Sequence, residues 1–251
     1  MRRIGAALLL LACTAISAAA EELVLSLSSD RVVIASNFTG TEVVLFGAVQ
    51  RDAASVPRRG SYDLVVTVRG PARDLVVRRK ERVLGIWINR ESRTFPGAPS
   101  YLAVIATRAP AEITSPAFRE RYGIGLLEAL PEPARRGPQS AEFREALLRL
   151  SEESGLYREV DDGAQFLNGQ LFRATIPIPA NVPIGRFEVE VSLFADEVML
   201  ARKTTMLEVA KSGFEAQIAF MAEHRPLAYG IAAALLALVF GWAATVVFRR
   251  D

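Results

Sequence analysis

The sequence has one cysteine, Cys13, and one histidine, His224, among its 251 residues. A zinc, haem or iron–sulfur centre held by several cysteines and histidines is therefore excluded, and so is a disulfide scaffold. There is no G-x-S-x-G motif and no phosphate-binding glycine loop, and Asp161-Asp162-Gly163 lacks the EF-hand pattern and is predicted to be a turn. Because the sequence contains no recognisable catalytic set, we predict a protein that is not an enzyme and uses no metal or other cofactor.

An excess of charge of one sign is also missing. Lys and Arg number 30 and Asp and Glu number 28, so without Arg2 and Arg3 the counts become 28 and 28. This balance predicts no nucleic-acid binding. The charge is unevenly distributed, however, because residues 51–93 hold eleven basic residues against five acids, whereas residues 112–162 hold eleven acids against seven basic residues.

Long apolar runs occur only near the two ends of the chain. Residues 1–20 combine a positive start, a 13-residue apolar run from Ile4 to Ile16, and three alanines before two acids. This layout predicts a secretory signal peptide that is cleaved after Ala20. The alternative is a lipoprotein signal, in which Leu10-Leu11-Ala12-Cys13 would make Cys13 a lipidated N-terminus.

Residues 227–248 form 22 uncharged residues followed by two arginines in the tail, residues 249–251. At about 1.5 Å per residue this run is about 33 Å long, which predicts a transmembrane helix in a lipid bilayer. The positive-inside rule places the tail in the cytoplasm and residues 21–225 in the periplasm of a bacterial inner membrane. Before the span, Phe214, Ile218 and Met221 predict a juxtamembrane amphipathic segment over residues 212–226.

Small residues repeat every four positions within the predicted span, at Ala233, Ala237 and Gly241. This spacing lets two helices approach closely and predicts a homodimer through the transmembrane helix. The alternative is that an alanine-rich span produces the spacing by chance.

Residues 21–211 show mainly the two-residue periodicity of strands, beginning with Leu23, Leu25 and Leu27. Turns are predicted at Arg69-Gly70-Pro71 and Phe95-Pro96-Gly97, and a hairpin at Asp196-Glu197. The predicted strands cover residues 23–27, 32–34, 41–49, 62–69, 74–80, 83–89, 101–106, 165–167, 171–178, 186–194 and 198–209.

The pattern changes over residues 110–155, where we predict a helical insertion. Ser115-Pro116 is typical of a helix start, and Ser140 is predicted to cap a second helix that Gly155 closes. The fold class is therefore mainly β, an immunoglobulin-like β-sandwich with a helical insertion and one C-terminal transmembrane helix. Two smaller β units divided near residue 110 are the alternative.

The densest charge lies in the segment Arg78-Arg79-Lys80-Glu81-Arg82. On a strand Arg78, Lys80 and Arg82 share one face, and Arg90 can lie nearby. Such a face can hold an anionic ligand, a lipid headgroup surface or an acidic partner. The alternative is a solvated strand edge that resists aggregation.

Trp87 is the only tryptophan outside the predicted span. A lone tryptophan on a strand lies most often in the sandwich core, which is the prediction we place first. The alternative is a recognition patch, in which Trp87 forms an aromatic wall with Phe95 and Tyr101 beside the basic strand.

Four segments carry a resemblance to a known family. They are residues 36–48, Val68-Arg69-Gly70-Pro71, Val77 to Arg90, and Pro99 to Val104. Together with both ends, the sequence resembles a transmembrane protein family of alphaproteobacteria whose function is unknown. The resemblance covers essentially the whole chain and implies a signal peptide, a periplasmic domain and a single C-terminal span. It also points to a transport partner, because members are often encoded near sulfite-exporter-like permeases, and it transfers no catalytic or ligand residue.

These observations lead to a first hypothesis, a non-enzymatic single-pass protein whose periplasmic sandwich is an interaction module. It would serve a membrane permease, another transporter or an envelope complex, with the contact carried by Arg78, Lys80, Arg82 and the Trp87 region. The second hypothesis is a periplasmic receptor for a small anion such as a sulfur oxyanion, bound by the same cations. A hydrolase of an unfamiliar kind ranks last.

Overall fold

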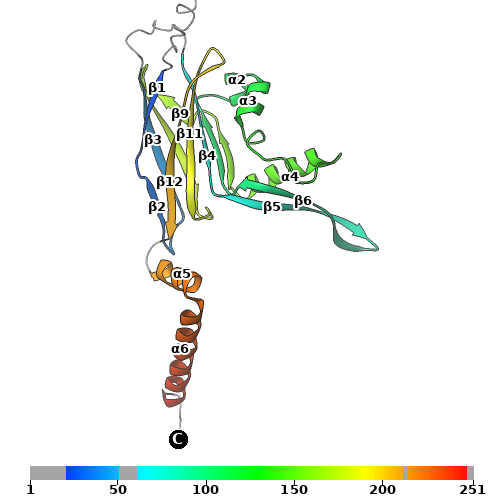
Figure 1. The fold of residues 1–251 in the computed structure, drawn as a ribbon, viewed down its shortest axis with the longest axis vertical. Coiled ribbons are helices and arrows are strands. Elements are labelled where there is room, and N and C mark those ends of the chain that lie inside the picture. Colours follow the sequence, from blue (N-terminus) through cyan, green and yellow to red (C-terminus); the bar gives the residue numbers. More distant parts are fainter. Residues whose placement is uncertain (1–20, 51–60, 212–213, 248–251) are drawn as a thin grey trace, which may run out of the picture.

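Two β-sheets pack face to face in the computed structural model, which describes residues 21–50, 61–211 and 214–247 (Figure 1). The first sheet is antiparallel and contains, in spatial order, β1 (Glu22–Leu27), β3 (Gly40–Gln50), β10 (Leu171–Pro179) and β9 (Ala164–Phe166). The second sheet contains, in spatial order, β2 (Arg31–Ile34), β12 (Val198–Lys211), β11 (Gly185–Ala195), β4 (Asp63–Arg69), β7 (Leu102–Ala106) and β8 (Tyr157–Val160). Its two outer pairs, β2 with β12 and β7 with β8, are parallel.

The main core lies between these two sheets. Alternate residues of each strand point inward, so that Leu45 of β3 and Phe172 of β10 meet Val66 of β4 and Val189 of β11 in one apolar cluster. The pairing of β3 with β10 and of β4 with β11 joins the two halves of the chain. The alternative of two β units divided near residue 110 is therefore wrong.

A second core lies on the other face of the six-stranded sheet. Three helices cover that face: α2 (Pro110–Ile113), α3 (Pro116–Tyr122) and α4 (Ser140–Glu153). The strands β4 and β7 are consequently buried on both faces, which explains their continuous apolar runs. Helices thus lie within residues 110–155, as the sequence predicts, and Ser115 stands just before a helix that begins at a proline.

Ser140 does not cap α4 as predicted. It is the first residue of the helix, and its hydroxyl oxygen accepts a hydrogen bond of 2.8 Å from the N–H of Gly137. Serine can instead bond to nearby backbone groups within a loop, and here it closes the turn that leads into the helix.

Several predicted strand boundaries differ in the structure. The hairpin turn at Asp196-Glu197 is confirmed, and both residues have positive φ angles, 49° and 65°. The turn predicted at Phe95-Pro96-Gly97 is wrong, because β6 (Ile86–Pro99) continues through these residues. The pairing with β5 is irregular there, and the N–H of Gly97 donates a hydrogen bond to the carboxylate of Asp74. The short strand β8 is absent from the prediction, because a four-residue segment with two exposed charged residues gives little periodic signal.

Two helices follow the sandwich, α5 (Phe214–His224) and α6 (Pro226–Val247). Residues Pro226–Thr245 are long and apolar enough to cross a membrane, with a mean hydropathy of 2.0 and none of that window buried within the chain. Ala233, Ala237 and Gly241 lie exposed on α6, so a homodimer through this helix stays a prediction. The predicted signal peptide, Cys13 and the cytoplasmic tail lie outside the described residues.

Candidate functional site

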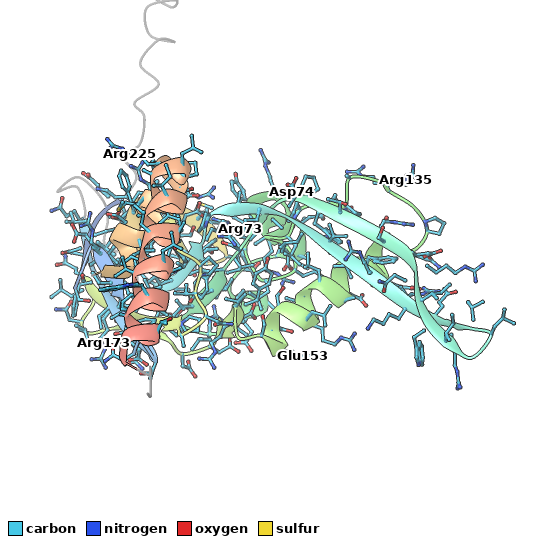
Figure 2. All side chains as sticks on the ribbon, turned by 90° about the horizontal axis from the view of Figure 1, so that it is seen from below. Arg73, Asp74, Arg135, Glu153, Arg173 and Arg225 are labelled. Atoms are coloured by element: carbon cyan, nitrogen blue, oxygen red, sulfur yellow. The ribbon has the colours of Figure 1, made fainter. Side chains whose placement is uncertain are left out.

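A two-stranded hairpin extends from the side of the sandwich and pairs with neither of its sheets. It consists of β5 (Ala72–Val83) and β6, residues 72–99 in all, and we call it the arm (Figures 1 and 2). The prediction of separate strands at 74–80 and 83–89 misses this hairpin, because its turn at Leu84-Gly85 falls inside the second predicted strand. Figure 2 shows the distal half of the arm projecting into open space.

The base of the arm is held by the second core. Phe95 is completely buried and Val77 is 6% exposed, and both belong to the cluster that includes Phe143 of α4. The guanidinium of Arg93 lies 5.1 Å from the centre of the Phe143 ring. The helical insertion therefore fixes the arm at its base and leaves the outer half without support.

The two faces of the arm carry different side chains. Directly paired residues of an antiparallel hairpin lie on the same face, so Arg78, Lys80 and Arg82 share a face with their partners Ser92, Asn89 and Trp87. We call Arg78, Lys80 and Arg82 the cationic stripe. Arg90 is the extra residue at a register shift on β6, so the alternation of β5 is unbroken from Arg78 to Arg82. Within the described part of the chain, no carboxylate lies in ion-pair distance of the three stripe side chains.

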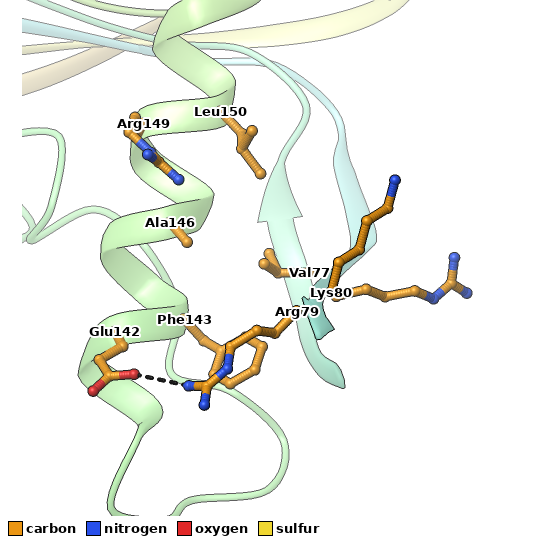
Figure 3. Close-up of a pocket in the computed structure, with 9 residues that line it drawn as sticks. Val77, Arg79, Lys80, Glu142, Phe143, Ala146, Arg149 and Leu150 are labelled. Atoms are coloured by element: carbon orange, nitrogen blue, oxygen red, sulfur yellow. Dashed lines mark hydrogen bonds and ion pairs between the residues drawn. The ribbon is translucent and has the colours of Figure 1, made fainter. Parts of the chain in front are cut away.

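The opposite face of the arm has compensated charges. Arg79 lies 3.4 Å from Glu81 and 3.3 Å from Glu142 of α4, and Arg90 lies 2.9 Å from Glu81. Figure 3 shows Arg79 reaching toward Glu142 while Lys80 points away from the helix. Positive charge without a carboxylate partner is therefore concentrated in the cationic stripe.

A groove of about 420 Å³ lies between β5 and α4 (Figure 3). Val77, Phe143, Ala146 and Leu150 contribute apolar surface to it. Arg149 and the segment 78–80 add positive charge, and Glu142 is the one acid among the described residues that line the groove. The groove can hold a small anion at its rim, although its apolar part suits a hydrocarbon group better.

The tip of the arm, residues 84–87, is apolar and exposed. Leu84 is 100% exposed, Ile86 65% and Trp87 68%. The core position that we predicted for Trp87 is therefore wrong, because the strand that carries it extends beyond the sandwich and has no second layer to cover it. The sequence does not predict Leu84 and Ile86 as surface residues; the local signal for a break in the strand is the isolated glycine Gly85.

The predicted aromatic wall does not form. Phe95 lies at the base of the arm in the second core, and Tyr101 is 1% exposed in the main core. The hydroxyl of Tyr101 donates a hydrogen bond to the carbonyl oxygen of Pro177, which joins the two sheets, and burial raises the pKa of this tyrosine well above its ordinary value. Tyr101 is thus a structural residue, and only Trp87 of the three aromatics belongs to the surface of the arm.

Among the described residues, no group of three His, Cys, Asp or Glu side chains is arranged to hold a metal ion. The chemistry of the arm therefore suits recognition of another surface. Its separated positive charges can bind an anionic surface, and its apolar tip lies next to them.

A β-sandwich followed by one apolar helix of membrane-spanning length defines a membrane protein with an extramembrane domain. The sequence model of the family described as "Putative transmembrane protein" matches residues 22–250, and the chain therefore belongs to that family. Neither the comparison with curated proteins nor that with solved structures gives a match.

Proposed function

We propose that this membrane protein is a non-enzymatic interaction module, anchored in the inner membrane with its sandwich in the periplasm. Its partner is a membrane transporter or envelope complex, and the arm makes the contact. The observation that carries the proposal is the cationic stripe, three positive side chains on one face of the arm that no carboxylate of the described chain neutralises.

The unsupported outer half of the arm supports this proposal. A two-stranded hairpin is only marginally stable in water unless a further strand or a helix covers it. Here α4 covers the base of the arm, where Val77 and Phe95 are buried against Phe143, and Figure 2 shows the outer part of the hairpin extending beyond the helices. A bound partner would supply the missing layer.

The charge arrangement also defines the kind of partner surface. Arg78 and Arg82 are four residues apart, so the stripe spans about 13 Å along an extended strand. An acidic segment of similar length can pair with all three cations, and Asn89 and Ser92 on the same face add neutral hydrogen-bonding groups. Such a contact weakens as salt concentration increases.

Replacing the whole stripe by alanine (Arg78→Ala, Lys80→Ala, Arg82→Ala) is expected to abolish capture of the partner. The tagged full-length protein would be isolated from its native membrane in mild detergent, and the proteins that co-purify identified by mass spectrometry. A membrane or envelope protein should be present in stoichiometric amount with the unaltered chain and fall at least about tenfold with the variant, since each lost charge-assisted contact removes roughly 0.5–1 kcal/mol or more.

The matched control removes three exposed cations of the sandwich, Arg173, Arg186 and Lys211. It changes the net charge equally and should leave capture intact. Equal loss in both variants would show a nonspecific charge effect, and undiminished capture by the stripe variant would contradict the assignment of the contact.

The groove beside α4 favours a second candidate function, a receptor for a small anion such as a sulfur oxyanion. Its lining combines Arg79, Lys80 and Arg149 with a single carboxylate, Glu142. Calorimetry of the full-length protein with sulfite, sulfate and phosphate distinguishes the two functions, because the interaction module produces no binding heat with these ions.

A further inference from the structure

The turn at the arm tip has an unusual first residue. Leu84 and Gly85 connect β5 to β6 as a two-residue turn, and both have positive φ angles, 50° and 88°. Turns of this kind strongly prefer Asn, Asp or Gly at the first position, because a side chain such as leucine is strained there. The turn itself thus gives no reason for a leucine at position 84.

Packing gives no reason for it either. Leu84 is 100% exposed, and its neighbours Ile86 and Trp87 are each about two-thirds exposed, at 65% and 68%. The tip therefore presents two large aliphatic side chains and an indole that the described chain does not cover. An apolar group in a strained, uncovered position indicates a contact outside the chain.

The composition of the tip and its flanks matches one environment closely. Tryptophan is enriched at the boundary between lipid tails and headgroups, and aliphatic side chains enter that layer readily. Arg82, whose charge no carboxylate of the described chain neutralises, lies directly across the hairpin from Trp87. Arginine can extend its guanidinium to lipid phosphates while its methylene chain stays in the apolar layer.

The anchor places this tip near a bilayer. The apolar helix α6 holds the chain at a membrane, which gives the tip a high effective concentration at that surface. Figure 1 shows the arm leaving the sandwich sideways, with its tip turned toward the end of the molecule at which α5 and α6 lie. A 12-residue strand extends about 40 Å, so the tip lies well to the side of the anchor.

From these observations we infer that the arm tip, residues 84–87, inserts into the headgroup layer of the phospholipid bilayer that α6 spans. This inference rests on the proposed function in one respect, that the arm works at the membrane surface. It adds a second point at which the protein is attached to the bilayer, besides α6. The bilayer holds the tip, and the cationic stripe behind it is then presented parallel to the membrane to a neighbouring protein.

The test uses the full-length protein with Trp242→Phe, which leaves Trp87 as the sole tryptophan. The purified protein is reconstituted without any partner into nanodiscs of phosphatidylethanolamine and phosphatidylglycerol, with or without lipids brominated near the headgroups. We expect brominated lipid to quench Trp87 emission at least roughly twofold and the bilayer to protect it from iodide, as for an interfacial indole. If iodide still quenches the Trp87 emission and brominated lipid does not, the inference is overturned.

The variant Leu84→Asn separates lipid contact from folding. Asparagine suits the turn better than leucine, so the hairpin should fold at least as well. We expect quenching by brominated lipid to fall markedly in this variant, and further when Ile86→Ser is added. Unchanged quenching would contradict insertion through the tip. The nanodiscs contain no partner protein, so a negative quenching result does not bear on the co-purification experiment. In the same way, a negative co-purification result does not bear on the quenching experiment.

Discussion

Replacing Glu190 by glutamine is expected to lower the free energy of unfolding by about 3 kcal/mol, because it removes one partner of a buried ion pair. Glu190 lies on β11, on the face of the six-stranded sheet that the helical insertion covers, and its side chain is 7% exposed. It pairs with Arg202 of β12 and with Arg69 of β4, whose Nη1 is 3.5 Å away. Both arginines would lose their common counter-charge.

The same cluster connects the sheet to the layer that supports the arm. Arg69 donates a hydrogen bond of 3.2 Å to the carbonyl oxygen of Gly123, just after α3, and Arg202 lies 5.9 Å from the centre of the Tyr122 ring. Loss of Glu190 should therefore loosen the helical insertion as well as the sheet. The two arginine side chains are 22% and 38% exposed, so water compensates them partly and the expected cost stays at the lower end of the range for buried pairs.

The matched control is Glu208→Gln, which removes the carboxylate of an exposed pair on β12. Arg31 and Glu208 are 2.7 Å apart with side chains 60% and 45% exposed, and such exposed pairs contribute little to stability. Urea unfolding of the full-length chain in detergent, followed by far-ultraviolet circular dichroism, measures both variants. Equal losses, or a loss below that of Glu208→Gln, would contradict the structural role of Glu190.

Replacing Gly47 by alanine is the second change with a large expected effect. Gly47 lies on β3 directly opposite Phe172 of β10, and a Cβ atom added there would lie 2.2 Å from the Phe172 ring. The ring is 1% exposed and packs edge-on against Phe166 at 5.7 Å, so it cannot move away without disturbing the core. We expect a loss of about 3 kcal/mol, at the upper end for overpacked cores.

Two further variants test the cause of that loss. Gly169→Ala, at a position where an added Cβ meets no atom within 4 Å, should change stability by less than about 0.5 kcal/mol. Combining Gly47→Ala with Phe172→Leu should cost less than the sum of the single changes, because the smaller side chain makes room for the new methyl group. Additive losses would show that the clash is not the cause. Denaturant midpoints of the unaltered chain, the three single variants and the double variant decide between these outcomes.

The sequence predicts the sandwich well where strands have one buried and one exposed face. The alternation of Leu171 to Pro179 and of Gly40 to Gln50 identifies β10 and β3 with correct extent to within two residues. The apolar run of β7 is identified by its length and its flanking turns. Pairing between distant strands is not encoded in local periodicity, so the joining of the two halves into one sandwich becomes evident only in the structure.

The arm shows why part of the site could not be predicted. The period of two correctly places Arg78, Lys80 and Arg82 on one face, because the irregularity falls on β6 and not on β5. The turn is hidden, because Val83-Leu84-Gly85-Ile86 reads as an apolar strand. Trp87 was expected in the core for the same reason: strand propensity indicates neither how far a hairpin extends beyond its sheet nor what lies above it.

Site-specific photo-crosslinking in the native membrane tests directly whether the arm contacts a partner through its cationic stripe. A photoreactive amino acid placed at Asn89 or Ser92 lies among the stripe cations without replacing one, and the same group at Ile88 lies on the opposite face of the hairpin. We expect a discrete adduct with one membrane or envelope protein from positions 89 and 92, and a much weaker one from position 88. Absence of any protein adduct from positions 89 and 92, or equal adducts from both faces, would contradict contact through the stripe.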